Sequence, residues 1–327
     1  MRNLIFLAIL GAVVMASLGC ISQEEKSENI TTLRIGYQPI THQIAEMVAA
    51  EKGWWAEDLE PFGVTEIKEY EFPSGPPEMQ AMLAGDLDIA YVGTAPPISA
   101  IAQGLDAKIV AAVNLNGSNL VFKPGLTYNG IQSLLGLSIG TLPPGSIQDT
   151  VMKKWLKDND VDLSRVKIIP MSPGDAVTAI EAGKIDGVFL NHPSPAIIEL
   201  DGKGQSVLAS GEMWPNHACC SLVVSGRLIR EHPDLVRQII KTHMRATDYV
   251  NANSEDAAKI CADKTGQDLK MVEYSMKTWD GKWISDPELQ IPSTVEYAKI
   301  DYEMSYTQKE LTEEDLFDTS FYESVKA

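Results

Sequence analysis

Loops rich in glycine, proline and neutral polar side chains are the part of this sequence best suited to binding chemistry. Three lie before residue 100 and three after residue 140: Gln38 to His42, Phe72 to Pro77, Gly93 to Pro97, Leu142 to Gln148, Ser172 to Asp175 and Asn191 to Pro195. They contain no lysine or arginine, but they offer the side chains of Gln38, Thr41, Ser74, Thr94, Ser146 and Asn191. Neutral donors and the backbone N–H groups of helix starts can hold an anion without a counter-charge. The loops therefore predict a site for a small oxyanion.

Of the five histidines we consider two as ligand groups, His192 and His217, which fall in or beside these loops. An imidazolium at an anion site would supply the positive charge that the loops lack. The segment Trp214 to Cys220 together with His192 contains ligand types suited to a borderline metal ion. Because no CxxC or HxxxH spacing accompanies them, we expect no metal ion there.

Cysteine usage gives no disulfide framework. Apart from Cys20, the chain has Cys219, Cys220 and Cys261, an odd number. One bridge from Cys261 to either neighbour and three buried free thiols are both compatible with this pattern.

Enzyme motifs and nucleic-acid features are both missing from the sequence. It contains no GxSxG, HExxH, GxxxxGK[ST] or GxGxxG motif, so we expect neither catalytic residues nor a cofactor. The formal net charge of -18 is spread along the chain, which disfavours nucleic acid and anionic membrane surfaces as partners.

An internal repeat positions the six loops. Arg34 to Pro39 and Ser138 to Pro143 both read as a strand followed by a loop, and Met82 to Ile89 matches Ile180 to Gly187. Helical spacing and short apolar runs alternate in each copy, which predicts strand, loop, helix, strand, helix, strand. In such sheets ligands bind beyond the carboxyl ends of the strands. We therefore predict the α/β class, with two doubly wound lobes joined by a hinge and the six loops at the crevice between them.

The rest of the chain sets the expected domain boundaries. The last third is not a third copy, and it reads as a strand from Ser221 followed by helices, including a long one over Pro233 to Ala252. We expect lobe one to be discontinuous, over residues 33–121 and 221–327. Lobe two is expected over residues 122–220.

The N-terminus predicts export. Arg2, a short apolar run and Ser17 to Cys20 resemble a lipoprotein signal peptide over residues 1–20, with Cys20 as the lipid-anchored residue. Because Ser17 departs from the usual pattern of lipoprotein signal peptides, cleavage as in an ordinary secreted protein is the alternative. The polar segment 21–32 predicts a flexible tether.

Taken in order, several short motifs resemble the nitrate/sulfonate/taurine-type (NMT1-like) solute-binding proteins of ABC importers. They extend over about Leu33 to Ala258 and include Gly36 to Pro39, Ala49 to Trp54, Phe72 to Gly75, Ala84 to Ile89, Gly145-Ser146 and Ala182 to Asp186. The resemblance implies a periplasmic binding protein of type II that closes on its ligand and docks on a permease and its ATPase. By position it implies a site lined by Gln38, Ser74, Gly75, Gly93, Thr94, Gly145, Ser146, Asn191 and His192. Many relatives have a tryptophan-acid-proline loop where this chain has Asn191-His192-Pro193, which bears on ligand choice.

The resemblance leaves several functions open. The first is a monomeric, lipid-anchored importer component on the outer face of the cell membrane that binds an alkanesulfonate, taurine or nitrate. The second binds a thiamine-precursor pyrimidine or aromatic acid through Tyr37, Trp54, Trp55 or Trp214. The third is a metal-dependent enzyme similar to a pyrimidine synthase, which the export signal disfavours. A surface sensor is a fourth.

Overall fold

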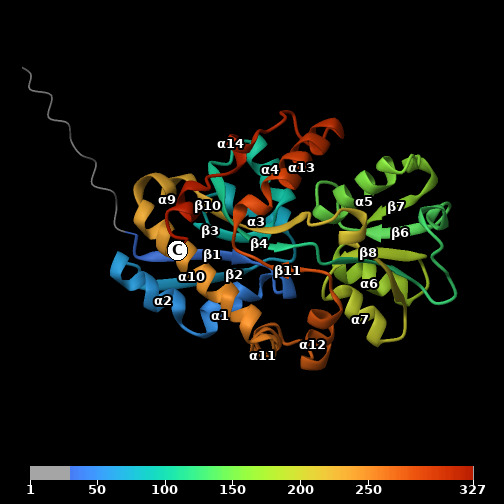
Figure 1. Cartoon of the computed structure of the whole chain (residues 1–327), viewed down its shortest axis with the longest axis horizontal. Helices are drawn as coiled ribbons and strands as arrows, with labels where there is room; N and C mark the ends of the chain where they lie inside the picture. The colour runs from blue at the N-terminus through green and yellow to red at the C-terminus, as the bar shows by residue number, and fades with distance from the viewer. Residues whose placement is uncertain (1–29, 327) are drawn as a thin grey trace, which may run out of the picture.

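The molecule consists of two lobes, each built on one β-sheet with helices on its faces (Figure 1). The computed structural model describes residues 30–326, so the expected leader, most of the tether and Cys20 lie outside the described residues. The strands are β1 (Thr32–Tyr37), β2 (Glu66–Glu71), β3 (Ile89–Gly93), β4 (Ala107–Leu115), β5 (Ser118–Phe122), β6 (Ser138–Thr141), β7 (Lys167–Pro170), β8 (Gly187–Asn191), β9 (Gln205–Ala209), β10 (Ala218–Ser225) and β11 (Lys282–Trp283).

The helices cover both faces of the sheets, and the long helix expected at Pro233 to Ala252 is found with those bounds. They are α1 (Ile44–Glu51), α2 (Trp54–Leu59), α3 (Gly75–Leu83), α4 (Ala95–Ala102), α5 (Ile147–Asp158), α6 (Pro173–Glu181), α7 (Ser194–Leu200), α8 (Ser210–Met213), α9 (Gly226–Glu231), α10 (Pro233–Ala252), α11 (Ser254–Thr265), α12 (Leu269–Thr278), α13 (Ile291–Glu303), α14 (Glu313–Leu316) and α15 (Ser320–Glu323). Within the described residues, none of these helices combines the length and the apolar character that a membrane span requires.

The two sheets have equivalent strand orders, which confirms the α/β class and the internal repeat. The first sheet runs β11-β4-β10-β3-β1-β2 and the second runs β7-β6-β8-β5-β9. In each, three parallel strands (β2, β1, β3 and β7, β6, β8) are followed by one antiparallel strand, β10 or β5. The sheets are therefore mixed, because a strand that arrives from the other lobe is inserted in the same place in each.

The chain crosses between the lobes twice, close to one point. The first crossing is at Asn116 and Gly117, between β4 and β5, and the second is just before His217, between α8 and β10. The backbone N–H of Asn116 donates to the carbonyl of His217 at 3.0 Å, so the two crossings are hydrogen-bonded. Since β5 pairs in the second sheet and β10 in the first, both crossings come a few residues before the boundaries at 121/122 and 220/221 that we expected.

The repeated Ala-Gly-x-x-Asp motif has a structural role in both lobes. Asp88 accepts hydrogen bonds from the backbone N–H and the guanidinium of Arg34 and also contacts Arg227, and its side chain is only 1% exposed. Asp186 accepts from the backbone N–H and hydroxyl of Ser138 and from Lys123. Lys123 and Ser138 lower the pKa of Asp186 to about 2. In each lobe the aspartate thus fixes the start of the central parallel strand, β1 or β6.

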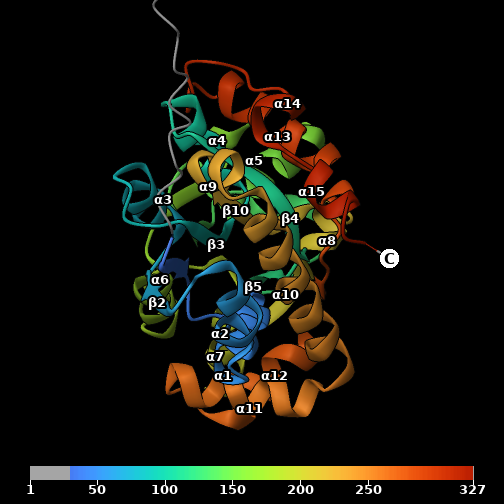
Figure 2. The ribbon, with the colours of Figure 1, turned by 90° about the vertical axis from the view of Figure 1, so that its left-hand side faces the viewer.

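The helices of the last third connect the lobes. Figure 2 shows α10 along the first lobe beside α1 and α2, with α11 and α12 continuing from it. Beyond them, α12 packs on α7 and α13 packs on α5, both helices of the second lobe.

A buried carboxyl lies at the contact between α5 and α13. Asp301 on α13 accepts a hydrogen bond from the hydroxyl of Thr150 on α5 at 3.4 Å, and its other oxygen has no partner among the described residues. Burial raises the pKa of Asp301 to about 7, and nearby Asp149 adds to this effect. The carboxyl therefore ionises near neutral pH, where its charge opposes the contact between the lobes.

Asp301→Asn should stabilise the protein increasingly as the pH rises from 5 to 7. Because the pKa of this carboxyl is higher in the folded than in the unfolded chain, folding holds its proton in this range and wild-type stability falls with pH. The difference in the free energy of unfolding, variant minus wild type, should grow by about 2 kcal/mol over these two pH units. Urea unfolding at several pH values measures it. Asp263→Asn, at an exposed site on α11, is the control, and a pH-independent difference for Asp301→Asn would contradict the assignment.

Candidate functional site

A cleft lies between the lobes, at the carboxyl ends of the parallel strands. It has about 480 Å³ of free space, part of it open to solvent. The first lobe contributes the residues that follow β1 and β3, the start of α3, and two residues of β10. The second lobe contributes the residues that follow β6 and β8. The lining residues are Gln38, Ile40, His42, Ser74, Gly75, Pro76, Gly93, Pro96, Leu142, Pro143, Ser146, Ile147, Gln148, Asn191, Cys219 and Cys220.

Six residues expected in the ligand site line this cleft, and four do not. The first group is Gln38, Ser74, Gly75, Gly93, Ser146 and Asn191. Thr94 lies behind the cleft wall, where its hydroxyl forms hydrogen bonds with the carbonyl of Cys219 and the hydroxyl of Ser221. Gly145 borders a neighbouring hollow beside Pro76 and Pro96. The other two, His192 and His217, are buried among protein groups.

His192 and His217 are neutral near pH 7 and do not supply the positive charge suggested from the sequence. Nδ1 of His192 is 3.0 Å from the hydroxyl of Ser275 on α12, and Nδ1 of His217 is 2.9 Å from that of Tyr297 on α13. Burial lowers the pKa of His192 to about 3 and that of His217 to about 4. Both rings therefore bind helices of the last third of the chain, and both remain uncharged.

Neutral polar groups project into the cleft from both lobes. Gln38 donates to the buried carboxyl of Glu78 at 3.0 Å, and burial raises the pKa of Glu78 well above its usual range. Glu78 therefore holds the side-chain amide of Gln38 in place at the cleft. Ser146 caps α5 by accepting from the backbone N–H of Asp149, and Gln148 in the first turn donates to Ser118. The first N–H groups of α5 are not used by the helix itself and remain available to a ligand.

Asn191 carries an unsatisfied polar atom at the cleft. Its Nδ2 donates to the carbonyl of His192 at 3.3 Å, while its Oδ1 is buried with no hydrogen-bond partner among the described residues. Leaving such an atom unpaired costs about 1–3 kcal/mol. A ligand that donates a hydrogen bond to this amide oxygen would recover that energy.

The cleft wall also holds a histidine and two cysteines that the sequence did not bring together. Nδ1 of His42 lies 3.3 Å from Sγ of Cys219 and 4.0 Å from Sγ of Cys220. All three cysteines of the described chain are free thiols, and Cys261 is buried elsewhere, on α11. A hydrogen bond from Cys219 and the nearby His42 lower the pKa of Cys220, whereas the same contact with Cys220 and burial raise that of Cys219.

The histidine beside this pair is His42, not His192 as the sequence suggested. His42 lies in a loop that the sequence selected, but its side chain was not singled out. Its neighbours come from a strand almost 180 residues further along the chain, and only the sheet order of the first lobe reveals their proximity.

None of the aromatic residues considered for ring stacking reaches the cleft. Tyr37 bonds Glu71, Trp55 packs on Tyr91, Trp54 packs on Tyr249, and Trp214 packs on Tyr297. The lining contains no tryptophan, tyrosine or phenylalanine. The described cleft therefore gives no support to an aromatic ring as the ligand.

Comparison with known proteins agrees with this geometry. The model of the NMT1-like family matches residues 26–263. A Bacillus subtilis protein provisionally named as an aliphatic sulfonates-binding protein is 26% identical over 321 residues, covering 96% of this chain and 95% of that one. Among solved structures, the alkanesulfonate-binding protein SsuA from Xanthomonas axonopodis pv. citri, bound to MOPS, has a TM-score of 0.76 at 20% identity and covers 88% of this chain and 98% of its own. The periplasmic nitrate-binding protein NrtA from Synechocystis PCC 6803 has a TM-score of 0.77 at 14% identity. The match covers 90% of this chain and 88% of that one.

Proposed function

Because the chain belongs to the NMT1-like family, we propose that it is the solute-binding component of an ABC importer and that it binds a small oxyanion in the cleft between its lobes. The observation that carries the proposal is the cleft itself. It lies at the carboxyl ends of both sheets and offers several neutral donors, and the described residues that line it include no lysine or arginine. This is the arrangement expected for reversible binding by closure of two lobes.

The lining favours an alkanesulfonate over a fully hydrated inorganic ion. The side chains of Gln38, Ser74, Ser146 and Gln148 and the start of α5 can donate to an oxyanion head. Ile40, Leu142 and Ile147, together with three prolines, form an apolar wall that suits a short alkyl group. Taurine and nitrate remain members of the same ligand class and belong in the test.

The proposal also includes the location of the protein and its partners. Ser17 to Cys20 supports export and a lipid anchor at Cys20 on the outer face of the cell membrane. A permease and its ATPase would receive the closed, loaded protein, which acts as a monomer. The absence of enzyme motifs supports binding rather than catalysis.

A thermal-shift screen tests the ligand class. A ligand that binds only the folded protein stabilises it by RT ln(1 + [L]/Kd), about 2.7 kcal/mol at one hundred times Kd. We expect a saturable rise in melting temperature with one or more of methanesulfonate, ethanesulfonate, taurine and nitrate. Acetate and bicarbonate serve as comparison anions. A flat response to the whole panel would contradict the oxyanion assignment.

Asn191→Leu should weaken the shift given by taurine, whose ammonium group can donate to the amide oxygen, without lowering the melting temperature of the free protein. The substitution removes a ligand-facing amide while also removing its unpaired, buried oxygen. Asn119→Leu is the matched control, because the buried Oδ1 of Asn119 on β5 also has no partner within residues 30–326, but this residue does not line the cleft. It should leave the ligand-induced shift intact. Equal loss of binding in both variants would argue against direct contact through Asn191.

A further inference from the structure

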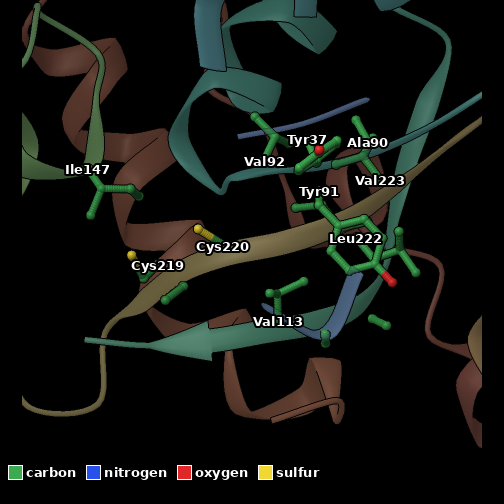
Figure 3. Close-up of a cluster of buried hydrophobic side chains, with 14 of the residues drawn as sticks. Tyr37, Ala90, Tyr91, Val92, Val113, Ile147, Cys219, Cys220, Leu222 and Val223 are labelled. Carbon is green, nitrogen blue, oxygen red and sulfur yellow. The ribbon is translucent and has the colours of Figure 1, made fainter. Parts of the chain in front are cut away.

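His42, Cys219 and Cys220 converge at one point of the cleft wall. All three are buried, and one ligand atom from each lies within 4.8 Å of the others. Figure 3 shows the sulfur atoms of Cys219 and Cys220 on the same side of β10, facing the side where Ile147 of the second lobe lies. All three residues also line the cleft, so the point where they meet is reachable from the ligand space.

An irregularity in β10 makes this convergence possible. Successive side chains of a regular strand point to opposite faces of the sheet, so adjacent cysteines would normally diverge. Here the pairing of β10 with β4 shifts between Ala218 and Cys220 and again between Cys220 and Ser221. Such bulges redirect a side chain and are frequent beside functional sites. The bulge thus lets both sulfur atoms face His42.

The hydrogen bonding of His42 leaves Nδ1, the ring nitrogen that faces the cysteines, free to act as a metal ligand. Its Nε2 is 2.9 Å from the carbonyl oxygen of Gly117, which can only accept, so Nε2 carries the proton. In the neutral ring Nδ1 then carries the lone pair, and it faces the two sulfur atoms. Gly117 is itself held by Asp280, whose Oδ1 accepts from its backbone N–H at 2.9 Å. A histidine whose second nitrogen donates to a fixed carbonyl is the usual arrangement of a metal ligand.

The spacing also fits a metal ion. Tetrahedral zinc with Zn–S of about 2.3 Å and Zn–N of about 2.05 Å places sulfur and nitrogen about 3.5 Å apart. The observed distances from Nδ1 to the two sulfur atoms, 3.3 Å and 4.0 Å, lie on either side of that value. We propose that Nδ1 of His42 and the Sγ atoms of Cys219 and Cys220 bind one thiophilic transition-metal ion, such as Zn²⁺, with a fourth position open to the cleft.

Such an ion would change what the cleft can bind. Two thiolates and one neutral imidazole suit zinc and neighbouring borderline ions better than Mg²⁺ or Ca²⁺, which prefer oxygen ligands. With three protein ligands, the fourth position would be filled by water or by an atom of the solute. This consequence rests on the proposed function, whereas metal binding by the three residues does not depend on it.

Cobalt substitution tests the site directly. The protein, purified without a polyhistidine tag and kept reduced with a phosphine, is titrated with Co²⁺ and then with Zn²⁺. We expect one equivalent of Co²⁺ to give thiolate-to-cobalt charge-transfer absorption and tetrahedral visible bands, which one equivalent of Zn²⁺ removes. Absence of a stoichiometric thiolate band would overturn the proposal.

Single substitutions identify the ligands. Cys219→Ser, Cys220→Ser and His42→Gln should each weaken metal binding by more than the roughly 10- to 100-fold that changes around metal ligands cost. Cys261→Ser is the matched control, because it removes a buried free thiol outside the cluster, and it should bind like wild type. Circular dichroism confirms that each variant is folded, and the two serine variants provide the readout if His42→Gln is not. Unchanged affinity in the folded cysteine variants would overturn the assignment.

The fourth coordination position of the metal ion can be tested separately. Azide, a small coordinating anion, added to the cobalt-loaded protein should shift the visible bands in a saturable way, because it can replace water at the fourth position. Bands that do not respond to azide would show that the ion is closed off from the cleft. Metal binding without any response in the solute screen would contradict the oxyanion proposal and leave the metal site standing, so the two failures are distinguishable.

Discussion

Gly117→Ala is expected to lower the free energy of unfolding by about 3 kcal/mol, from a left-handed backbone penalty of about 1–2 kcal/mol and overpacking of about 1–3 kcal/mol. Gly117 has a φ of 97°, and a Cβ there would lie 2.9 Å from Nε2 of His42 and 2.9 Å from a ring carbon of Trp279. Its carbonyl also accepts from the backbone N–H of His192. The substitution therefore strains the first crossing between the lobes. Chemical denaturation of the free protein measures the loss.

Gly104→Ala separates the two causes of this loss. Gly104 has nearly the same φ, 102°, but a Cβ there would meet nothing within 4 Å. Its variant should lose only the backbone penalty, about 1–2 kcal/mol. If both alanine variants lose the same free energy, contact with His42 and Trp279 contributes nothing.

Asp88→Ala should cost about 3 kcal/mol of stability, because charge-assisted hydrogen bonds are lost and buried donors are left unpaired. Asp88 accepts from the backbone N–H of Arg34 and pairs with the guanidinium groups of Arg34 and Arg227. Both arginines are partly exposed and can regain water, which keeps the cost below that of a fully buried ion pair. The free energy of unfolding from urea titration is the measurement.

Asp86→Ala is the control for Asp88, since it lies in the same motif but its side chain is exposed. It should change stability by less than about 0.5 kcal/mol. A similar loss in both variants would mean that the motif acts through its local charge rather than by fixing the start of β1.

The fold could be predicted from the sequence because its signals are local and occur twice. The match between Met82 to Ile89 and Ile180 to Gly187 reflects Asp88 and Asp186, which secure equivalent strands in the two lobes. The strands β5, β9 and β11 were not anticipated, and β2 was expected only as a member of the repeat, without bounds. The mostly exposed β2 lies at a sheet edge, and β5 is short and pairs with strands much later in the chain.

The site could be predicted only in part, because loop position does not determine side-chain direction. Gln38, Ser146 and Asn191 reach the cleft from loops that the repeat identified. His192 occupies an equivalent loop, but its ring turns toward Ser275 on a helix of the last third, which no local pattern indicates. The cluster of His42 with Cys219 and Cys220 depends on a strand bulge and on sheet order, and neither has a sequence signal here.

The insertion of β10 between β3 and β4 constrains the order in which the chain can fold. All strands of the second sheet come from one contiguous stretch, from β5 to β9, so that sheet can form as soon as β9 has been synthesised. The first sheet must wait, with β3 and β4 lacking the strand that joins them, until β10 follows more than a hundred residues after β4. The second lobe can therefore fold on its own, while the first lobe is completed late and presents unpaired strand edges in the meantime.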